Sequence, residues 1–270
     1  MANRLDGQVA WISGGASGMG KATAELFAAE GAGVCIADVQ AEHGKALADQ
    51  LNKSGRQAIF TPCDVGREEQ VRDSIDRAAS ELGPLQTIVN CAGIVHTKRL
   101  DEYSVEEWDQ LMAINVKSIF LSIKHGLKHL KKHRRSYVVN VGSISSFVAQ
   151  GSTPAYTTSK GAVLQLTRSI ALDYAAIGLR CNCVCPGITD TPLLRHHLSF
   201  TPDPEGMLRE RLRRVPTGVV LTPLDVAKSI LYLSCEDSSG VTGTSLIIDG
   251  GYLTAAEWHA PEHTAFMDPA

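Results

Sequence analysis

Short runs of apolar and β-branched residues alternate with longer segments of helical period along most of this chain. Such short runs are typical of strands buried on both faces, and the longer segments are typical of helices that cover a sheet. The alternation predicts an α/β protein with a doubly wound parallel sheet, helices on both faces and three αβα layers. The predicted strands are 9–13, 33–37, 57–61, 87–89, 137–141, 179–184 and 245–248.

Helices are predicted between most of these strands. Ser104 and Glu107 form a capping box, and apolar residues recur at helical spacing from Trp108 to Leu130, so one long helix is expected there. Pro154 can open the next helix, which should extend to about residue 176. The other predicted helices are 21–30, 42–51, 68–82 and one that begins at 222.

No linker, repeat or shift in composition divides the chain, so one domain is expected over residues 1–252. Two segments depart from the regular pattern. Residues 188–221 are rich in Pro, Arg and His and have weak periodicity, and the tail at 253–270 is polar but carries Trp258 and Phe266. We expect this tail either to reach a neighbouring subunit and help close its substrate site, or to end as a frayed terminus.

Composition narrows the class of function. The 270 residues include 44% hydrophobic and 20% charged residues, as in ordinary globular proteins. A net charge of −3 argues against nucleic acid as a partner, and no apolar run approaches the ~18 residues of a membrane span. The seven cysteines and an N-terminus without an apolar signal segment predict a cytoplasmic protein.

A glycine-rich turn follows the first predicted strand. Gly14, Gly18 and Gly20 have the spacing G-x3-G-x-G, and Ser17 and Met19 lie among them. Glycines here let the backbone approach a pyrophosphate, while the following helix supplies unpaired N–H groups and the positive end of its dipole. A turn that needs glycine only for tight packing is the alternative.

Asp38 ends the second strand, about 20 residues beyond the glycines. A carboxylate at this point can hold both ribose hydroxyls and would repel a 2′-phosphate, and residues 39–42 contain no Arg or Lys. The expected cofactor is therefore NAD rather than NADP. A surface aspartate that caps the next helix is the alternative.

Two further segments should reach the same edge of the sheet. Asp64 and Val65 follow the third strand, and Asn90, Ala92 and Gly93 end the fourth. Because the carboxyl ends of parallel strands share one edge, a ligand that crosses this edge would meet both segments. Helix capping by Asp64 and a plain turn after Asn90 are the alternatives.

The candidate chemistry comes from three side chains. Tyr156 and Lys160 are four residues apart and therefore lie on one face of a predicted helix. A fixed ammonium beside a phenol favours the phenolate, which can then act as a general base. Ser143 follows the fifth strand, where its hydroxyl can hold a substrate oxygen as charge develops. This group, with the glycine turn, predicts hydride transfer between a nicotinamide and an alcohol or ketone.

Asn115 lies on the apolar face of the long helix and needs a polar partner there. It either orders a water chain toward Lys160 or pairs with a neighbouring backbone.

Two other clusters contain residue types that can bind ligands. The basic residues of segment 188–221 are interpreted as a solvated helix face, with contact to an anionic substrate as the alternative. Cys181, Cys183 and Cys185 share one face of a strand, but no fourth ligand is evident, so buried packing is favoured and no metal site is predicted. The basic residues are Arg195, His196, His197, Arg209, Arg211, Arg213 and Arg214.

In their order and spacing, these motifs resemble the short-chain dehydrogenase/reductase family, and they cover the chain as far as Tyr252. One departure is that Cys91 stands where the family usually has a second Asn. The motifs that carry the resemblance are Gly14-x3-Gly18-x-Gly20, Asp38, Asp64, Asn90-Cys91-Ala92-Gly93, Asn115, Ser143, Tyr156-x3-Lys160 and Pro186-Gly187-x3-Thr191.

The resemblance implies a Rossmann-type sheet of seven strands, a homotetramer or homodimer formed through the two long helices, and a small-molecule alcohol or ketone as substrate. It implies that Asn115, Ser143, Tyr156 and Lys160 are the catalytic residues, with Lys160 also on the nicotinamide ribose. The cofactor residues that it adds are Asp64 and Val65 at the adenine, and Pro186, Gly187, Ile188 and Thr191 near the nicotinamide.

Two other functions stay open at this point. An NADP-dependent carbonyl or ketoacyl reductase is the first, and Asp38 speaks against it. A non-catalytic, cofactor-binding regulator with the same fold is the second. The presence of Ser143, Tyr156 and Lys160 together argues against a protein that has lost catalysis.

Overall fold

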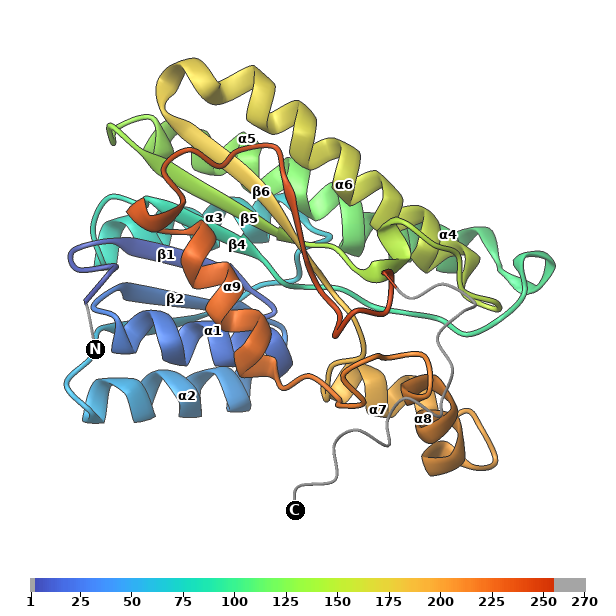
Figure 1. Cartoon of the computed structure of the whole chain (residues 1–270). Helices are drawn as coiled ribbons and strands as arrows, with labels where there is room; N and C mark the ends of the chain where they lie inside the picture. The colour runs from blue at the N-terminus through green and yellow to red at the C-terminus, as the bar shows by residue number, and fades with distance from the viewer. Residues whose placement is uncertain (1–2, 255–270) are drawn as a thin grey trace.

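The computed structural model describes residues 3–254 and builds them around one sheet (Figure 1). Its seven strands have the order β3-β2-β1-β4-β5-β6-β7, and each neighbouring pair is parallel. This confirms the predicted doubly wound, seven-stranded sheet. The strands are β1 (Val9–Ser13), β2 (Gly33–Asp38), β3 (Ala58–Pro62), β4 (Thr87–Asn90), β5 (Ser136–Val141), β6 (Leu179–Pro186) and β7 (Ser245–Ile248).

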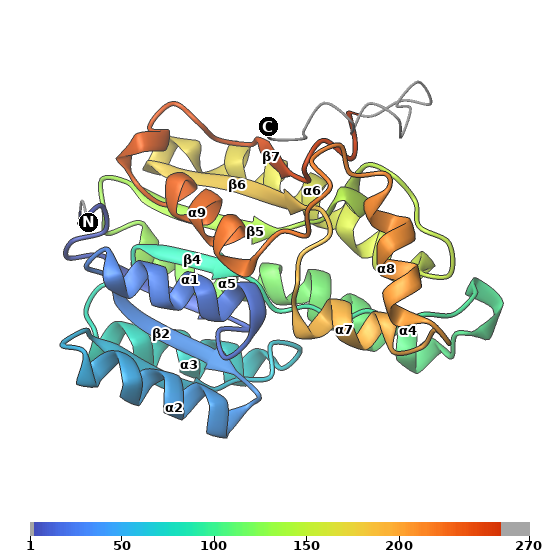
Figure 2. The same ribbon diagram turned by 60° about the horizontal axis from the view of Figure 1, so that its bottom comes forward.

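Helices cover both faces of the sheet (Figure 2). One face carries α1 (Gly18–Ala29), α2 (Ala41–Lys53) and α9 (Pro223–Leu233), and the other carries α3 (Glu68–Glu81), α5 (Ser118–Leu130) and α6 (Pro154–Tyr174). The remaining α-helices are α4 (Val105–Met112), α7 (Pro192–Leu198) and α8 (Pro204–Leu212). Short 3₁₀ turns lie at Leu100–Glu102, Ile144–Ser146, Ala175–Ile177 and Glu236–Ser238.

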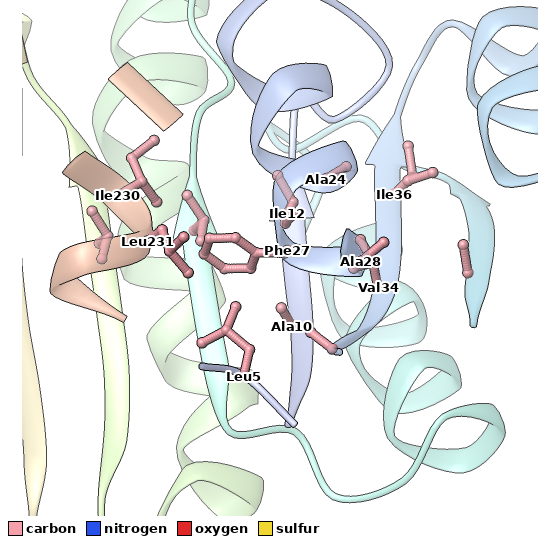
Figure 3. Close-up of a cluster of buried hydrophobic side chains, with 14 of the residues drawn as sticks. Leu5, Ala10, Ile12, Ala24, Phe27, Ala28, Val34, Ile36, Ile230 and Leu231 are labelled. Atoms are coloured by element: carbon pink, nitrogen blue, oxygen red, sulfur yellow. The ribbon is translucent and has the colours of Figure 1, made fainter. Parts of the chain in front are cut away.

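The core lies between the sheet and each helical layer, because the central strands are buried on both faces. Figure 3 shows one cluster, in which the ring of Phe27 from α1 lies among Leu5, Ile12 and Leu231. Phe27 has no exposed surface, and Leu231 brings α9 against α1. This burial fixes α1 against β1, and with it the turn that joins them.

The long helix predicted from residue 104 is correct at its start but is not a continuous α-helix. The capping box of Ser104 and Glu107 opens α4, with the Glu107 N–H donating to Ser104 Oγ at 3.2 Å. A π-helical turn at Ala113–Lys117 then precedes α5. Apolar spacing does not reveal such a turn. π turns occur often at functional sites, and this one contains Asn115.

The poorly periodic segment 188–221 contains the two short helices α7 and α8, which lie beyond the carboxyl ends of the strands (Figures 1 and 2). Each begins with proline at its first position and has a side-chain N-cap, Thr191 for α7 and Asp203 for α8. Between residues 3 and 254, the structure has no helix with the length and apolar character of a membrane span. The predicted role of the tail lies outside the described residues, except for Leu253 and Thr254.

The strand order leaves a crevice at the carboxyl ends of β1 and β4. From β1 the chain continues to β2 and β3 on one side, whereas β4 and the later strands lie on the other side. Ligands of open α/β sheets bind at this topological switch point. The predicted glycine turn and the segment after β4 meet there, since the Ala92 N–H donates to Ser13 Oγ at 3.3 Å.

Candidate active site

The glycine turn is packed tightly against the segment after β4. Gly14 has a φ of +64°, and a Cβ there would lie 2.9 Å from the Cα of Ala92. A Cβ at Gly20 would collide with the carbonyl oxygen of Gly14. Tight packing, the alternative interpretation of the turn, is therefore a real requirement. It is compatible with a ligand site because it brings the start of α1 to the crevice.

The start of α1 has unpaired N–H groups. Its N-cap, Ser17, makes no side-chain capping bond, and the first turn holds no acidic residue. The first N–H groups of a helix need acceptors and carry the positive end of the dipole. An α-helix that opens in this way into a crevice suits an anionic group such as a pyrophosphate.

A cleft of about 910 Å³ of empty space, the expected nucleotide cleft, runs along this edge of the sheet. It brings together most of the residues predicted to bind the nucleotide. These are Gly14, Ser17, Gly18, Met19, Gly20, Asp38, Asp64, Val65, Ala92, Gly93 and Thr191.

Asp38 faces this cleft at the end of β2, and it is 5% exposed. Its two carboxylate oxygens accept N–H bonds from Ala16 in the glycine turn, at 3.0 Å, and from Gln40, at 2.9 Å. The N-cap of α2 is Gln40, so Asp38 is not the cap that the alternative interpretation proposed. Asp38 therefore joins the glycine turn to β2 and places a negative charge in the cleft.

Asp64 lies in the same cleft but in a more open position, with 42% of its side chain exposed. Its carboxylate accepts the Gly66 N–H at 2.9 Å, and its own N–H donates to Gln70 Oε1 at 2.7 Å. The N-cap of α3 is Arg67, so Asp64 does not cap that helix.

A second cavity, of about 680 Å³ of empty space, adjoins the cleft and shares Met19, Thr191 and Leu193 with it. Ser143 and Tyr156 both line this cavity, together with Pro186, Gly187 and Ile188. The cavity thus joins the end of β5, the start of α6 and the segment after β6. A molecule in it would contact Ser143 and Tyr156 and lie next to the nucleotide cleft.

Ser143 is 7% exposed and sits just beyond β5. Its hydroxyl oxygen accepts the Ser145 N–H at 3.0 Å. Since a hydroxyl has one proton to donate and that proton is not used in this bond, Ser143 can donate to a ligand oxygen in the cavity.

Tyr156 and Lys160 are both on α6, on the face that the i, i+4 spacing predicts. Lys160 is 5% exposed, and its Nζ donates to the Val141 carbonyl at 2.8 Å and lies 5.5 Å from the centre of the Tyr156 ring. Within residues 3–254 no carboxylate is paired with this ammonium. A buried positive charge therefore stands beside the phenol that faces the cavity.

Two asparagines, Asn90 and Asn115, are buried and line neither the cleft nor the second cavity. Asn115 accepts the Ile94 N–H at 2.9 Å and donates to the Ile94 carbonyl and to Ser159 Oγ, each at 3.0 Å. Of the two predicted roles of Asn115, the structure therefore shows the pairing with a neighbouring backbone, that of Ile94. Asn90 donates to Asn140 Oδ1 at 2.8 Å and links β4 to β5. Both amides hold the segment that carries Ala92 and Gly93 in place.

Several lining residues of the second cavity were not singled out from the sequence. Gln150 belongs to the turn before α6, where its amide donates to Ser145 Oγ at 2.8 Å. Gly142 and Thr189 are two others, and the rest are apolar residues that no motif marks. They are Val95, Ile144, Leu193 and Leu194.

The basic cluster of segment 188–221 divides into two groups. Arg195, Arg209 and Arg213 are exposed and paired with nearby carboxylates, as expected of a solvated face. For Arg211 and His197 this interpretation was wrong, because both line the second cavity. The spacing held a signal: residues three and four apart share a helix face, so Leu208, Arg211 and Leu212 form the half-buried face of α8.

The cysteines are structural. Cys181, Cys183 and Cys185 are completely buried in β6, and all seven cysteines of the chain are free thiols. Cys91 lines the nucleotide cleft, and burial raises the pKa of its thiol to about 12, so the thiol is neutral. The small neutral side chain suits this close-packed edge of the sheet.

The family model described as Enoyl-(Acyl carrier protein) reductase matches residues 14–253. Dehydrogenase/reductase SDR family member 6 of Danio rerio is 38% identical over 92% of this chain and 98% of its own length. The 2,5-dichloro-2,5-cyclohexadiene-1,4-diol dehydrogenase of Sphingobium indicum is 34% identical over 93% and 98%.

Among solved structures, that of levodione reductase superimposes with a TM-score of 0.90 at 29% identity, over 94% of this chain and all of the other. The fold, the family model and these relatives agree with the resemblance drawn from the motifs. The chain belongs to the short-chain dehydrogenase/reductase family, whose members are oxidoreductases that act on alcohol and ketone groups.

Proposed function

We propose that this protein is an NAD-dependent dehydrogenase that transfers a hydride between NAD(H) and a secondary alcohol or ketone, with Tyr156 as the general acid and base. The observation that carries the proposal is the arrangement of Ser143 and Tyr156 in one cavity beside the nucleotide cleft, with the ammonium of Lys160 close to the phenol ring.

The residues of the cleft fit a dinucleotide. The uncapped start of α1 suits the pyrophosphate, and the cleft is also lined by Asp38, by the partly exposed Asp64 and by the buried Val65, where an adenine would lie. Asp38 supports NAD, because its negative charge would oppose a 2′-phosphate and residues 39–42 offer no cation. When bound, the nicotinamide would accept the hydride in oxidation and donate it in reduction.

The side chains of the second cavity would handle the proton. Ser143 donates a hydrogen bond to the substrate oxygen and holds it beside Tyr156. In oxidation the hydroxyl proton passes to the Tyr156 oxygen while the hydride leaves the carbinol carbon, and a carbonyl forms. In reduction the same phenol returns the proton. Lys160 stabilises the phenolate by its charge, and Asn115 holds Ile94 and the segment before it.

We also expect a homotetramer or homodimer. Phe120 on α5 is 53% exposed and Leu172 on α6 is 81% exposed, and large apolar side chains so placed on two long helices are typical of a subunit interface. Seven free thiols suit a reducing compartment and support the cytoplasm as its location. Light scattering on the purified chain measures the assembly directly, and a monomer at micromolar concentration would contradict this expectation.

The function is tested by the formation of NADH from NAD with pools of secondary alcohols, grouped as polyols, hydroxy acids, steroids and cyclic alcohols. We expect turnover with one group, and a decrease in kcat of about 10²–10⁴-fold in Tyr156→Phe with NAD affinity unchanged by calorimetry. A Tyr156→Phe variant with full activity would refute the assignment of the proton to this residue. An active wild-type enzyme that uses NADP alone would refute the cofactor assignment.

A further inference from the structure

Arg211 differs from the other arginines of the lid, which consists of α7, α8 and the two residues after α8, because Arg195, Arg209, Arg213 and Arg214 are all exposed. Arg195, Arg209 and Arg213 have side chains 69–75% exposed, and each is paired with a carboxylate. Arg211 is half-buried, and among residues 3–254 no carboxylate is paired with it. A cation removed from water without a counter-ion is costly, so a partner of opposite charge is expected.

Arg211 lines the cavity that also contains Ser143 and Tyr156, and its guanidinium contacts His197, which lines the same cavity. Burial lowers the pKa of Arg211, although a guanidinium remains protonated at any pH the protein meets. The cavity therefore holds the proposed proton-transfer residues together with a positive charge that has no acidic partner in the described chain.

His197 fixes the position of this charge. The distance between Arg211 Nη2 and His197 Nε2 is 2.6 Å, and that between His197 Nδ1 and Thr97 Oγ1 is 3.1 Å. Because a guanidinium only donates, Nε2 must accept, and the ring proton therefore lies on Nδ1 and is donated to Thr97. The neutral ring uses one of the five guanidinium N–H donors, which leaves others for a ligand.

Apolar side chains also line the cavity, beside the polar residues Gln150, Thr189 and Thr191. Val95, Ile144, Leu193 and Leu194 line it between segments that are far apart in the sequence. A ligand that satisfies both the proton-transfer residues and Arg211 thus has a polar oxygen, an apolar carbon skeleton and an anionic group.

We propose that Arg211 binds an oxyanion of the substrate, and that the enzyme acts on hydroxy acids or keto acids with an apolar carbon skeleton. This rests on the proposed function, because the hydroxyl or ketone of the acid is taken to be the reacting group. A carboxylate fits best, since its two oxygens match the planar fork of a guanidinium. A sulfonate offers the same chemistry and is a second arm of the test.

The proposal is tested by measuring turnover of hydroxy acids of four to eight carbons. Each acid is compared with its methyl ester and with the corresponding hydroxy sulfonate. We expect the wild type to favour an acid over its ester, and Arg211→Gln to raise KM for that acid by about tenfold to a hundredfold. The KM for the ester should stay unchanged, and kcat should change by only a few-fold. Arg213→Gln, at the exposed C-cap of the same helix, is the matched control and should resemble the wild type.

Binding without turnover separates this proposal from the proposed function. Hexanoate and hexanamide are titrated by calorimetry into the wild type, Arg211→Gln, Arg211→Lys and Arg213→Gln, with and without NAD. We expect hexanoate to bind the wild type better than hexanamide, to lose affinity in Arg211→Gln and to keep part of it in Arg211→Lys. Equal hexanoate affinity in the wild type and Arg211→Gln, or no binding to either, would overturn the proposal. If no alcohol is oxidised, the function fails while the titration still decides whether Arg211 binds an anion.

Discussion

Replacing Asp38 by Asn removes the charge that we expect to select NAD, while keeping the size of the side chain. The carboxylate is 5% exposed, lies in the nucleotide cleft and accepts the N–H groups of Ala16 and Gln40. An amide has one oxygen, so it can accept only one of these two N–H groups well, and its NH₂ would face the other. The substitution therefore changes both cofactor choice and stability.

The size of each effect follows from the geometry. One pair of unit charges about 4 Å apart near a protein surface interacts by about 4 kcal/mol, which is roughly a 10³-fold change in affinity. Some of this repulsion is screened by salt, so we expect Asp38→Asn to lower the NAD-to-NADP ratio of kcat/KM by at least about 10²-fold. Loss of one charge-assisted bond should lower the free energy of unfolding by about 1.5–3 kcal/mol.

The assay measures kcat/KM for both cofactors at a fixed concentration of the active alcohol, and urea denaturation measures stability. Asp64→Asn is the matched control, because Asp64 lines the same cleft with 42% of its side chain exposed, and we expect its cofactor ratio to stay near that of the wild type. Val39→Arg, at a position 68% exposed in the cleft, should raise the use of NADP further when combined with Asp38→Asn. An unchanged cofactor ratio in Asp38→Asn would refute the reasoning.

Three further predictions concern the structure around the site. Phe27→Ala should lower the free energy of unfolding by about 3–5 kcal/mol in urea, because the fully buried ring fills the core behind α1; a change below 1 kcal/mol would contradict this packing. Gly20→Ala should weaken NAD binding, measured by calorimetry, and should also destabilise the fold, because its Cβ collides with the Gly14 carbonyl; unchanged affinity and stability would contradict the close approach. Burial and the charge of Arg211 lower the pKa of His197, so as pH falls this ring is protonated in the unfolded chain before it is protonated in the folded protein. The folded protein therefore has its full free energy of unfolding above the unfolded pKa of about 6.5, and this free energy decreases as pH falls from there toward the folded pKa of His197. In urea at pH 7 and pH 5, His197→Gln should therefore lose less stability than the wild type, and equal losses would contradict the prediction.

The sheet could be predicted from the sequence because each strand is a local pattern. The strands β1, β5 and β6 are buried along their whole length, so apolar and β-branched residues predominate in them, although β5 holds Asn140 and β6 holds Arg180 and Asn182. The predicted site residues at the ends of these strands follow from the same argument, because parallel strands deliver their carboxyl ends to one edge. Tyr156 and Lys160 needed only helical spacing, which is also local.

Features that depend on contacts between distant segments were harder to predict. The π turn at Ala113–Lys117 keeps the apolar spacing of a helix. At this turn the Asn115 side chain accepts the Ile94 N–H and donates to the Ile94 carbonyl. The two residues are 21 positions apart, so the spacing of residues within one element does not predict their contact. The pairing of Asn90 with Asn140, 50 residues away, has the same character.

The second cavity explains why the motifs predict the chemistry better than the substrate. Its walls come from the segments after β4, β5 and β6, the start of α6 and the two lid helices, so its shape is a property of tertiary packing. In the sequence, Arg209, Arg211 and Arg213 look alike. In an α-helix a step of two residues turns the side chain by about 200°, so Arg209 on α8 and Arg213 at its C-cap share the solvent side while Arg211 points the opposite way. The residue that we propose to select the substrate is thus distinguished from its neighbours by helix geometry, and its partner His197 comes from a different helix. A lid built in this way can change the substrate through single substitutions, while the strand ends and α6, which carry the proposed proton-transfer residues, stay the same.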